Sequence, residues 1–174
     1  TNSFFDSIIN WAKKRYGWNI EKEWIVITPG VVSGLNICIR ALTKESDGIV
    51  IQPPVYAPFF NVINKNNRTL ITNPLIIKEG KYSINFIDLE TKLKTAKALI
   101  LCSPHNPVGR VWSKDELKKI TKLCIENNVL IISDEIHCDL ILKGFKHTNI
   151  ASISEETKMN SVTFIAPSKT FNLP

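Results

Sequence analysis

Four short runs of mostly apolar residues constrain the fold of this chain more than any other feature of its sequence. They span residues 48–51, 98–101, 129–132 and 162–165, and runs of this length are typical of buried strands. The run at 129–132 is apolar throughout, which is typical of a parallel sheet covered on both faces. Segments with apolar residues at helical spacing separate the runs. This alternation predicts a three-layer α/β/α domain with a mostly parallel sheet.

The expected helices carry recognisable start and stop signals. They span residues 2–16, 31–42, 57–64, 87–93 and 114–126. Gly17 is well placed to end the first, Asn85 can cap the fourth, and Ser113 with Glu116 forms a capping box before the fifth. Further strands are expected at residues 24–28, 70–71 and 82–84.

The composition is that of one globular domain. The 174 residues are 44% hydrophobic and 22% charged, and no apolar run approaches the roughly 20 residues that span a bilayer. The net charge is +6, but the basic residues are interleaved with acidic ones. The densest basic cluster lies within residues 114–122, where we expect a solvated helix face. We therefore expect no nucleic-acid partner and no membrane partner.

The cysteines indicate a reducing compartment. They are widely spaced, each lies in an apolar context, and no C-x-x-C pair occurs. We expect buried free thiols, no zinc or other metal site, and a cytoplasmic protein. The four residues are Cys38, Cys102, Cys124 and Cys138.

Polar segments follow the expected strands. They occupy residues 28–34, 103–110, 133–137 and 166–172. Alone, each is a weak signal, because an aspartate after a strand often caps a helix and a lysine in a loop is usually solvated. In α/β sheets, however, ligands bind beyond the carboxyl ends of the strands. We therefore expect these segments to line one edge of the sheet and to form a site there.

Three motifs in these segments resemble the fold-type I enzymes that use pyridoxal 5'-phosphate (PLP), the class I/II aminotransferase-like superfamily. They are Asn106-Pro107-x-Gly109, Ser133-Asp134-Glu135 and Ser168-Lys169-Thr170-Phe171. Their order and spacing also fit, with 28 residues from Asn106 to Asp134 and 35 from Asp134 to Lys169. Longer runs are similar to the cystathionine β-lyase (C–S lyase) branch; they span residues 24–32, 52–59, 102–112 and 133–140.

The resemblance implies a role for three polar side chains. Lys169 would hold PLP covalently and later move protons at the substrate Cα; the alternative is a surface lysine. Asp134 would lie beside the pyridine nitrogen, where a buried carboxylate favours the protonated ring; the alternative is a helix cap. Asn106 would donate to the ring oxygen O3′, which is compatible with a turn-forming role before Pro107.

Three further side chains would surround the cofactor ring. Ile136 would press on one face of the ring and Tyr56 would stack on the other, with a core tyrosine as the alternative for Tyr56. His137 stands where many relatives have a tyrosine that faces O3′. It is a candidate cofactor contact; the alternative is a structural histidine, or one that contacts the residues around the cofactor and not the cofactor itself.

The cofactor phosphate would meet the start of the helix at residues 31–42. There the backbone N–H groups of Val31 and Val32 and the helix dipole would favour an anion. Ser168 would add a hydroxyl. One departure from the family pattern is Ala166, because many relatives have Ser or Thr three residues before the lysine. At this position the chain has no hydroxyl to offer the phosphate.

The resemblance also implies that residues 1–174 are part of a PLP-binding large domain. We expect an N-terminal segment and a small C-terminal domain in a longer protein, since the chain lacks an initial Met and reaches Pro174 soon after Lys169. The small domain would carry the arginine that binds the substrate carboxylate. We expect a homodimer in the longer protein and poor activity of the 174 residues alone.

The leading functional hypothesis is β-elimination on a sulfur amino acid such as cystathionine, giving pyruvate, ammonia and a thiol. The motifs do not distinguish this from a class I/II aminotransferase, which has the same cofactor site. A third alternative is a non-enzymatic regulator that acts by protein contact. The presence of Lys169, Asp134 and Asn106 argues against a degenerate site.

Overall fold

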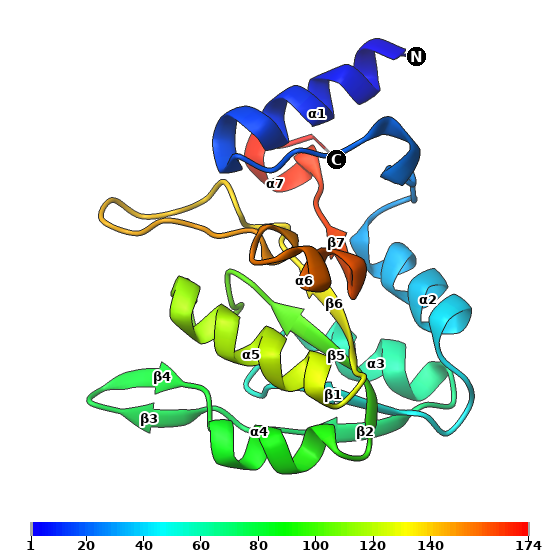
Figure 1. Cartoon of the computed structure of the whole chain (residues 1–174), viewed down its shortest axis with the longest axis vertical. Coiled ribbons are helices and arrows are strands. Elements are labelled where there is room, and N and C mark those ends of the chain that lie inside the picture. The colour runs from blue at the N-terminus through cyan, green and yellow to red at the C-terminus, as the bar shows by residue number, and fades with distance from the viewer. Residues whose placement is uncertain (1, 174) are drawn as a thin grey trace.

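A parallel five-stranded sheet forms the middle layer of the computed structural model, which describes residues 2–173 (Figure 1). Thr1 and Pro174 lie outside the described residues. All neighbouring strands are parallel, in the order β2-β1-β5-β6-β7. The strands are β1 (Gly48–Ile51), β2 (Thr69–Thr72), β5 (Ala96–Cys102), β6 (Leu130–Asp134) and β7 (Ser161–Phe164). The expected three-layer α/β fold is confirmed.

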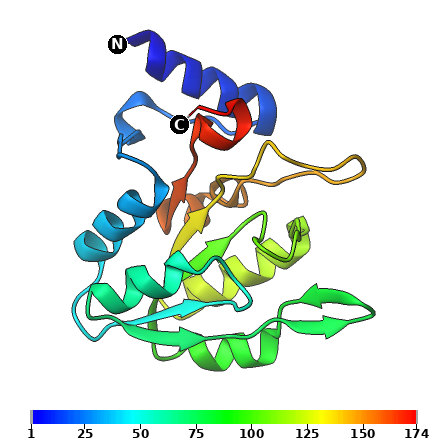
Figure 2. The same ribbon diagram turned by 180° about the vertical axis from the view of Figure 1, so that it is seen from behind.

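Helices cover both faces of the sheet. Figure 1 looks onto the face covered by α4 (Phe86–Leu93) and α5 (Lys114–Glu126), with α6 (Glu155–Met159) beside them. Figure 2 looks from the other side, onto α2 (Val31–Leu42) and α3 (Pro58–Lys65). Each predicted helix is present to within a residue or two, and Ser113 forms the predicted capping box with Glu116.

Each face of the sheet has its own apolar core. Because successive strand residues point to opposite faces, Ile49 and Ile51 pack toward α2 and α3, whereas Val50 packs toward α4 and α5. All four cysteines are buried and unpaired, as predicted. Among residues 2–173, no helix combines the length and apolar composition needed to cross a bilayer.

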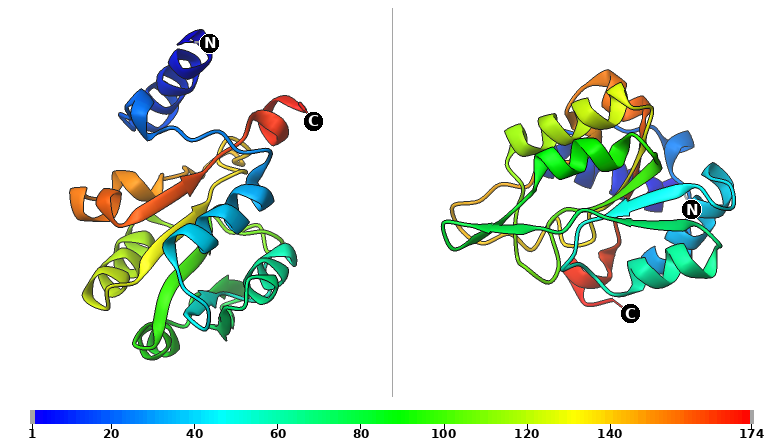
Figure 3. Two further views of the ribbon diagram at one scale, coloured as in Figure 1. Left: turned by 90° about the vertical axis from the view of Figure 1, so that its right-hand side faces the viewer. Right: turned by 90° about the horizontal axis from the view of Figure 1, so that it is seen from below.

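Two elements lie beyond one end of the sheet. The helix α1 (Asn2–Tyr16) ends at Gly17, as predicted, and lies beside the short helix α7 (Pro167–Phe171), which follows β7 (Figures 1 and 3). A chain segment through the short helix η1 (Lys22–Trp24) connects α1 to α2. At the other end, β3 (Ile76–Lys78) and β4 (Lys81–Ser83) form a hairpin.

The predicted strand at residues 24–28 is wrong. Its first residue ends η1, and the rest runs to α2 without pairing to any described strand. Val26 and Ile27 are 81% and 59% exposed. An apolar run forms a strand only when a neighbouring strand satisfies its backbone groups, and residues 2–173 offer none here. The sequence also gave no signal for β3, whose side chains are all exposed.

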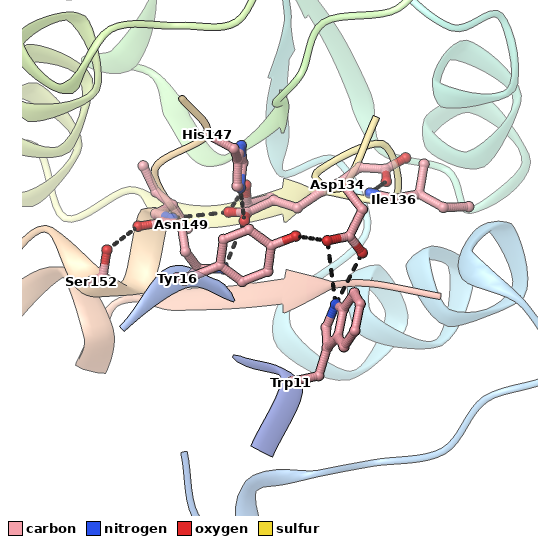
Figure 4. A network of polar contacts seen from close by, with 11 residues as sticks. Trp11, Tyr16, Asp134, Ile136, His147, Asn149 and Ser152 are labelled. Atoms are coloured by element: carbon pink, nitrogen blue, oxygen red, sulfur yellow. Dashed lines mark hydrogen bonds and ion pairs between the residues drawn. The ribbon is translucent and has the colours of Figure 1, made fainter. Parts of the chain in front are cut away.

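A fully buried carboxylate fixes the chain where it leaves the sheet at the end of β6. Glu135 is 0% exposed, and four groups donate hydrogen bonds to it. The Ser133 hydroxyl and the Ile150 N–H reach Oε1 at 2.9 Å, and His147 Nε2 and Asn149 Nδ2 reach Oε2 at 2.7 Å. His147 and Asn149 converge on this carboxylate in Figure 4. These bonds fold residues 136–146 into a loop that returns to β6 before η2 (Ile150–Ser152).

We expect Glu135→Gln to lower the free energy of unfolding by about 2–4 kcal/mol, because the amide NH₂ would face two donors that the carboxylate now satisfies. The measurement is urea denaturation followed by circular dichroism. Glu90→Gln, at an exposed position on α4, is the matched control. Equal midpoints for the two variants would contradict this account of Glu135.

Candidate active site at the carboxyl edge of the sheet

The strand register brings three of the predicted segments to one edge of the sheet. Cys102 at the end of β5 is opposite Asp134 at the end of β6, and Asp134 is opposite Phe164 at the end of β7. The ladder continues one step further, because Ser103 N–H donates to Asp134 O at 3.0 Å. The segments at 103–110, 133–137 and 166–172 therefore leave the sheet at the same level.

The fourth segment reaches this edge by a different route. It was expected to follow a strand at 24–28, but that strand is absent and the segment instead opens α2. The helix packs closely on β7: a Cβ added to Gly34 would lie 2.6 Å from the ring of Phe164. The start of α2 thus lies beside the last strand, as the left view of Figure 3 shows.

Asp134 is a buried carboxylate whose charge is stabilised by few neighbouring groups. It is 5% exposed, and among residues 2–173 its side chain accepts one hydrogen bond, from the Ile136 N–H to Oδ1 at 3.1 Å (Figure 4). Burial raises the pKa of Asp134 to about 6, the Ile136 N–H lowers it, and the charge of Glu135 raises it. A cation beside this carboxylate would remove the cost of burying its charge.

Asn106 and His137 line one groove of about 280 Å³ beyond the ends of β5 and β6. Both residues are half-buried. Burial and the nearby positive charge of Lys169 lower the pKa of His137, which favours its neutral ring. Apolar side chains also line this groove, among them Leu140, Leu142 and Phe145. The groove therefore combines an amide, an imidazole and apolar side chains.

The loop that carries Asn106 is held by buried aromatic groups. Trp112 is 0% exposed and its Nε1 donates to Cys102 O at 2.9 Å. His105 Nε2 donates to Pro54 O at 3.0 Å, and its ring meets that of Trp112 edge-on. Burial lowers the pKa of His105. These contacts give His105 and Trp112 a positioning role for the loop.

Lys169 follows the last strand, as predicted, but it lies in the short helix α7 rather than in a loop. Its side chain is exposed. Its positive charge helps to lower the pKa of His137, which lines the groove together with Asn106. Ala166 precedes α7 and supplies no side-chain cap.

The start of α2 presents free backbone donors. Gly30 stands before the helix with φ +97, and no side chain caps the first turn. Val31 and Val32 are the first two helical residues, and their N–H groups have no partner within the helix. Val31 is buried and Val32 is exposed. This arrangement favours an anion such as a phosphate.

Two predicted residues are not joined to the others by contacts. The Tyr56 ring is 39% exposed and meets Phe59 edge-on at 5.8 Å. Ser168 is half-buried in α7. Among residues 2–173, neither side chain forms a hydrogen bond. Ile136, in contrast, packs against the core under α2 that contains Val31.

No role was predicted for Glu135, His147 or Asp139, although the structure places all three close to the site. Glu135 and Asp139 lie inside the run that resembles the C–S lyase branch. Their partners lie up to 128 positions away along the chain, and one sequence does not reveal such pairs. Among residues 2–173, no group of His, Cys, Asp and Glu side chains is arranged to hold a metal ion.

Comparison with known proteins agrees with the resemblance that the sequence motifs indicate. The family described as "Aminotransferase class I and II" matches residues 1–174. Cystathionine beta-lyase PatB of Bacillus subtilis is 48% identical over 170 residues, which cover 97% of this chain and 44% of that protein. Protein MalY of Escherichia coli is 30% identical over 175 residues, with 99% and 44% covered.

Solved structures agree in fold. Cystalysin from Treponema denticola, which contains a pyridoxal 5'-phosphate cofactor, superposes with a TM-score of 0.97 at 45% identity, covering 99% of this chain and 44% of that one. The PLP-bound C–S lyase of Staphylococcus hominis gives 0.93 at 34% identity, covering 99% and 45%. The chain thus spans less than half the length of these relatives. It belongs to the class I and II aminotransferase family.

Proposed function

We propose that the protein carrying this chain is a PLP-dependent carbon–sulfur β-lyase. Its substrate would be a sulfur amino acid such as cystathionine, and its products pyruvate, ammonia and a thiol. The observation that carries the proposal is Asp134, a buried carboxylate with one hydrogen bond and a raised pKa at the carboxyl edge of the sheet. The 48% identity to a cystathionine beta-lyase supports the choice of reaction.

The described residues fit PLP at both ends of that molecule. The buried Asp134 suits a protonated ring nitrogen, because the two opposite charges would compensate each other where the carboxylate is buried. The uncapped first turn of α2, with Val31 and Val32, suits the phosphate. Between them, Asn106 and His137 would face O3′, Ile136 and Tyr56 would lie against the ring, and Ser168 would add a donor for the phosphate.

PLP, when bound, withdraws electrons from the substrate Cα and so makes its proton removable. The chain supplies the remaining groups. Lys169 Nζ would hold the cofactor, give way to the substrate amine, and then take the Cα proton as general base. Asp134 would keep the ring nitrogen protonated. The apolar side chains of Leu140, Leu142 and Phe145 would line the groove beside the leaving thiolate.

The larger protein is also part of the proposal. Residues 1–174 would form part of its large domain, with the carboxylate-binding arginine in a separate C-terminal domain. We propose a homodimer in the cytoplasm. The exposed apolar side chains of Val26 and Ile27 support a surface that another part of the longer protein or its dimer partner would cover. Light scattering of the longer protein would measure its mass, and a monomer would exclude the dimer.

Pyruvate formation distinguishes the proposed lyase from an aminotransferase of the same family. The protein is incubated with cystathionine and PLP, with and without an added keto acid. A lyase forms pyruvate without the keto acid, whereas an aminotransferase depends on it. We expect residues 1–174 alone to be poorly active, and turnover by them at ordinary enzyme rates would contradict the expected division into domains.

Lys169→Ala is expected to abolish covalent PLP binding and to lower the rate of pyruvate formation by on the order of 10²–10⁴-fold, because both the cofactor link and the general base are lost. The visible absorbance of bound PLP and the assay above provide the measurements. Lys118→Ala, at an exposed position on α5, is the matched control. Unchanged absorbance in Lys169→Ala would exclude this lysine as the residue that binds PLP covalently.

The raised pKa of Asp134 makes the stability of the PLP-free chain depend on pH. Its folded-state pKa of about 6 exceeds the ordinary value of 3.8, so between these values the folded state keeps a proton that the unfolded state has lost. The free energy of unfolding therefore falls as the pH rises through this window, by roughly 3 kcal/mol from this group.

Asp134→Asn should remove this pH dependence. Without PLP, we expect the free energy of unfolding of Asp134→Asn, relative to that of the wild type, to rise by up to roughly 3 kcal/mol between about pH 4 and pH 7. With PLP the order should reverse, because the cofactor nitrogen stabilises a carboxylate but not an amide. Urea denaturation at both pH values, with exposed Asp6→Asn as control, measures the effect. A constant difference would contradict it.

A further inference from the structure

Asp139 is a second carboxylate near the site, and four side chains donate to it. Its side chain is 7% exposed. Trp11 Nε1 lies 3.1 Å from Oδ2, Arg15 Nε lies 3.3 Å from Oδ1, and the Tyr16 hydroxyl donates to Oδ1. The fourth donor is the Thr170 hydroxyl, 3.0 Å from Oδ2. We name these five residues the Asp139 cluster.

The Asp139 cluster joins three parts of the chain. Trp11, Arg15 and Tyr16 belong to α1, Asp139 to the loop after β6, and Thr170 to α7. In Figure 4, the labelled Trp11 and Tyr16 point toward one carboxylate beside the end of β6. Although burial acts to raise the pKa of Asp139, the hydrogen bonds from Tyr16, Thr170 and Trp11 lower it. The cluster therefore holds an ionised carboxylate.

The helix α7 depends on this cluster for its position. It has five residues, none of them buried. The residue after Lys169, Thr170, donates to Asp139, and the next, Phe171, meets the Trp11 ring edge-on at 5.3 Å. A helix this short is not stable by itself. The contacts of Thr170 and Phe171, which follow Lys169 directly, therefore help to hold it in place.

We propose that Asp139 is a positioning residue for Lys169, which fixes the helix α7, and with it the lysine amine, against α1 at the sheet edge. Asp139 does not touch the reacting atoms; it acts through Thr170. The role of Lys169 toward PLP rests on the proposed function, but the anchoring of α7 by Asp139 does not. The two parts can therefore be tested separately.

Thr170 offers a matched pair of variants in the full chain. Thr170→Val keeps the shape of the side chain and removes its donor, whereas Thr170→Ser keeps the hydroxyl. Loss of a hydrogen bond to a charged group should change the equilibrium between anchored and released α7 by about tenfold. Thr91→Val, at an exposed position on α4, controls for the substitution itself.

Two measurements are made on each variant. Hydrogen exchange of a peptide covering residues 166–172 reports the anchoring of α7. Reduction with borohydride at increasing PLP concentrations, followed by intact mass, reports the apparent affinity of Lys169 for PLP. In Thr170→Val we expect about tenfold faster exchange in this peptide and about tenfold weaker trapping. Thr170→Ser should behave like the wild type, with exchange in β5 and β6 unchanged throughout.

A double variant tests whether Thr170 acts through Asp139. Asp139→Asn alone should also weaken trapping, and adding Thr170→Val to it should cost little more, since the two groups share one bond. Additive effects, unchanged exchange in Thr170→Val, or faster exchange across the whole sheet would each overturn the proposal. If the wild type traps no PLP, the proposed function fails, and the exchange data alone decide whether Asp139 anchors α7.

Discussion

The buried carboxylate of Glu135 is the interaction on which the arrangement of the site depends. An unpaired charge in a protein interior costs several kcal/mol, so the chain must bring donors to it. Ser133 comes from within β6, and His147, Asn149 and Ile150 come from the far end of the loop that follows. Closing that loop sets the direction in which the chain leaves the sheet. The groove beyond β5 and β6 takes its shape from this closure.

Two adjacent carboxylates have opposite environments at this point. Glu135 is satisfied by four donors from the protein, whereas Asp134 has one. Successive side chains at the end of a strand point to opposite sides, so the two do not compete for the same partners. Glu135 therefore stabilises the fold, whereas the carboxylate of Asp134 remains available to bind a ligand. This difference is the physical basis for our proposal that Asp134 would contact the ring nitrogen of PLP.

Much of the fold could be predicted from local patterns, because those patterns act locally. The apolar runs at β1, β5, β6 and β7 and the capping box of Ser113 were read correctly. The failures have a common cause. Residues 24–28 are apolar enough for a strand, but strand formation needs a partner that their own sequence does not specify. The candidate site follows the same rule: local motifs pointed to Asn106, Asp134 and Lys169 as candidates, whereas the partners of Asp139 are distant in sequence and carried no signal.

The span of the Asp139 cluster has a consequence for how the protein folds. Trp11 and Asp139 are 128 positions apart, and Thr170 lies a further 31 beyond. Contacts of such high sequence separation are made only after the entropy of closing a long loop has been overcome. The parallel sheet between them must largely form first, because it brings the two ends of the chain together. The helix α7, which carries Lys169, is therefore among the last elements to dock, and the candidate site is completed at the end of folding rather than at its nucleus.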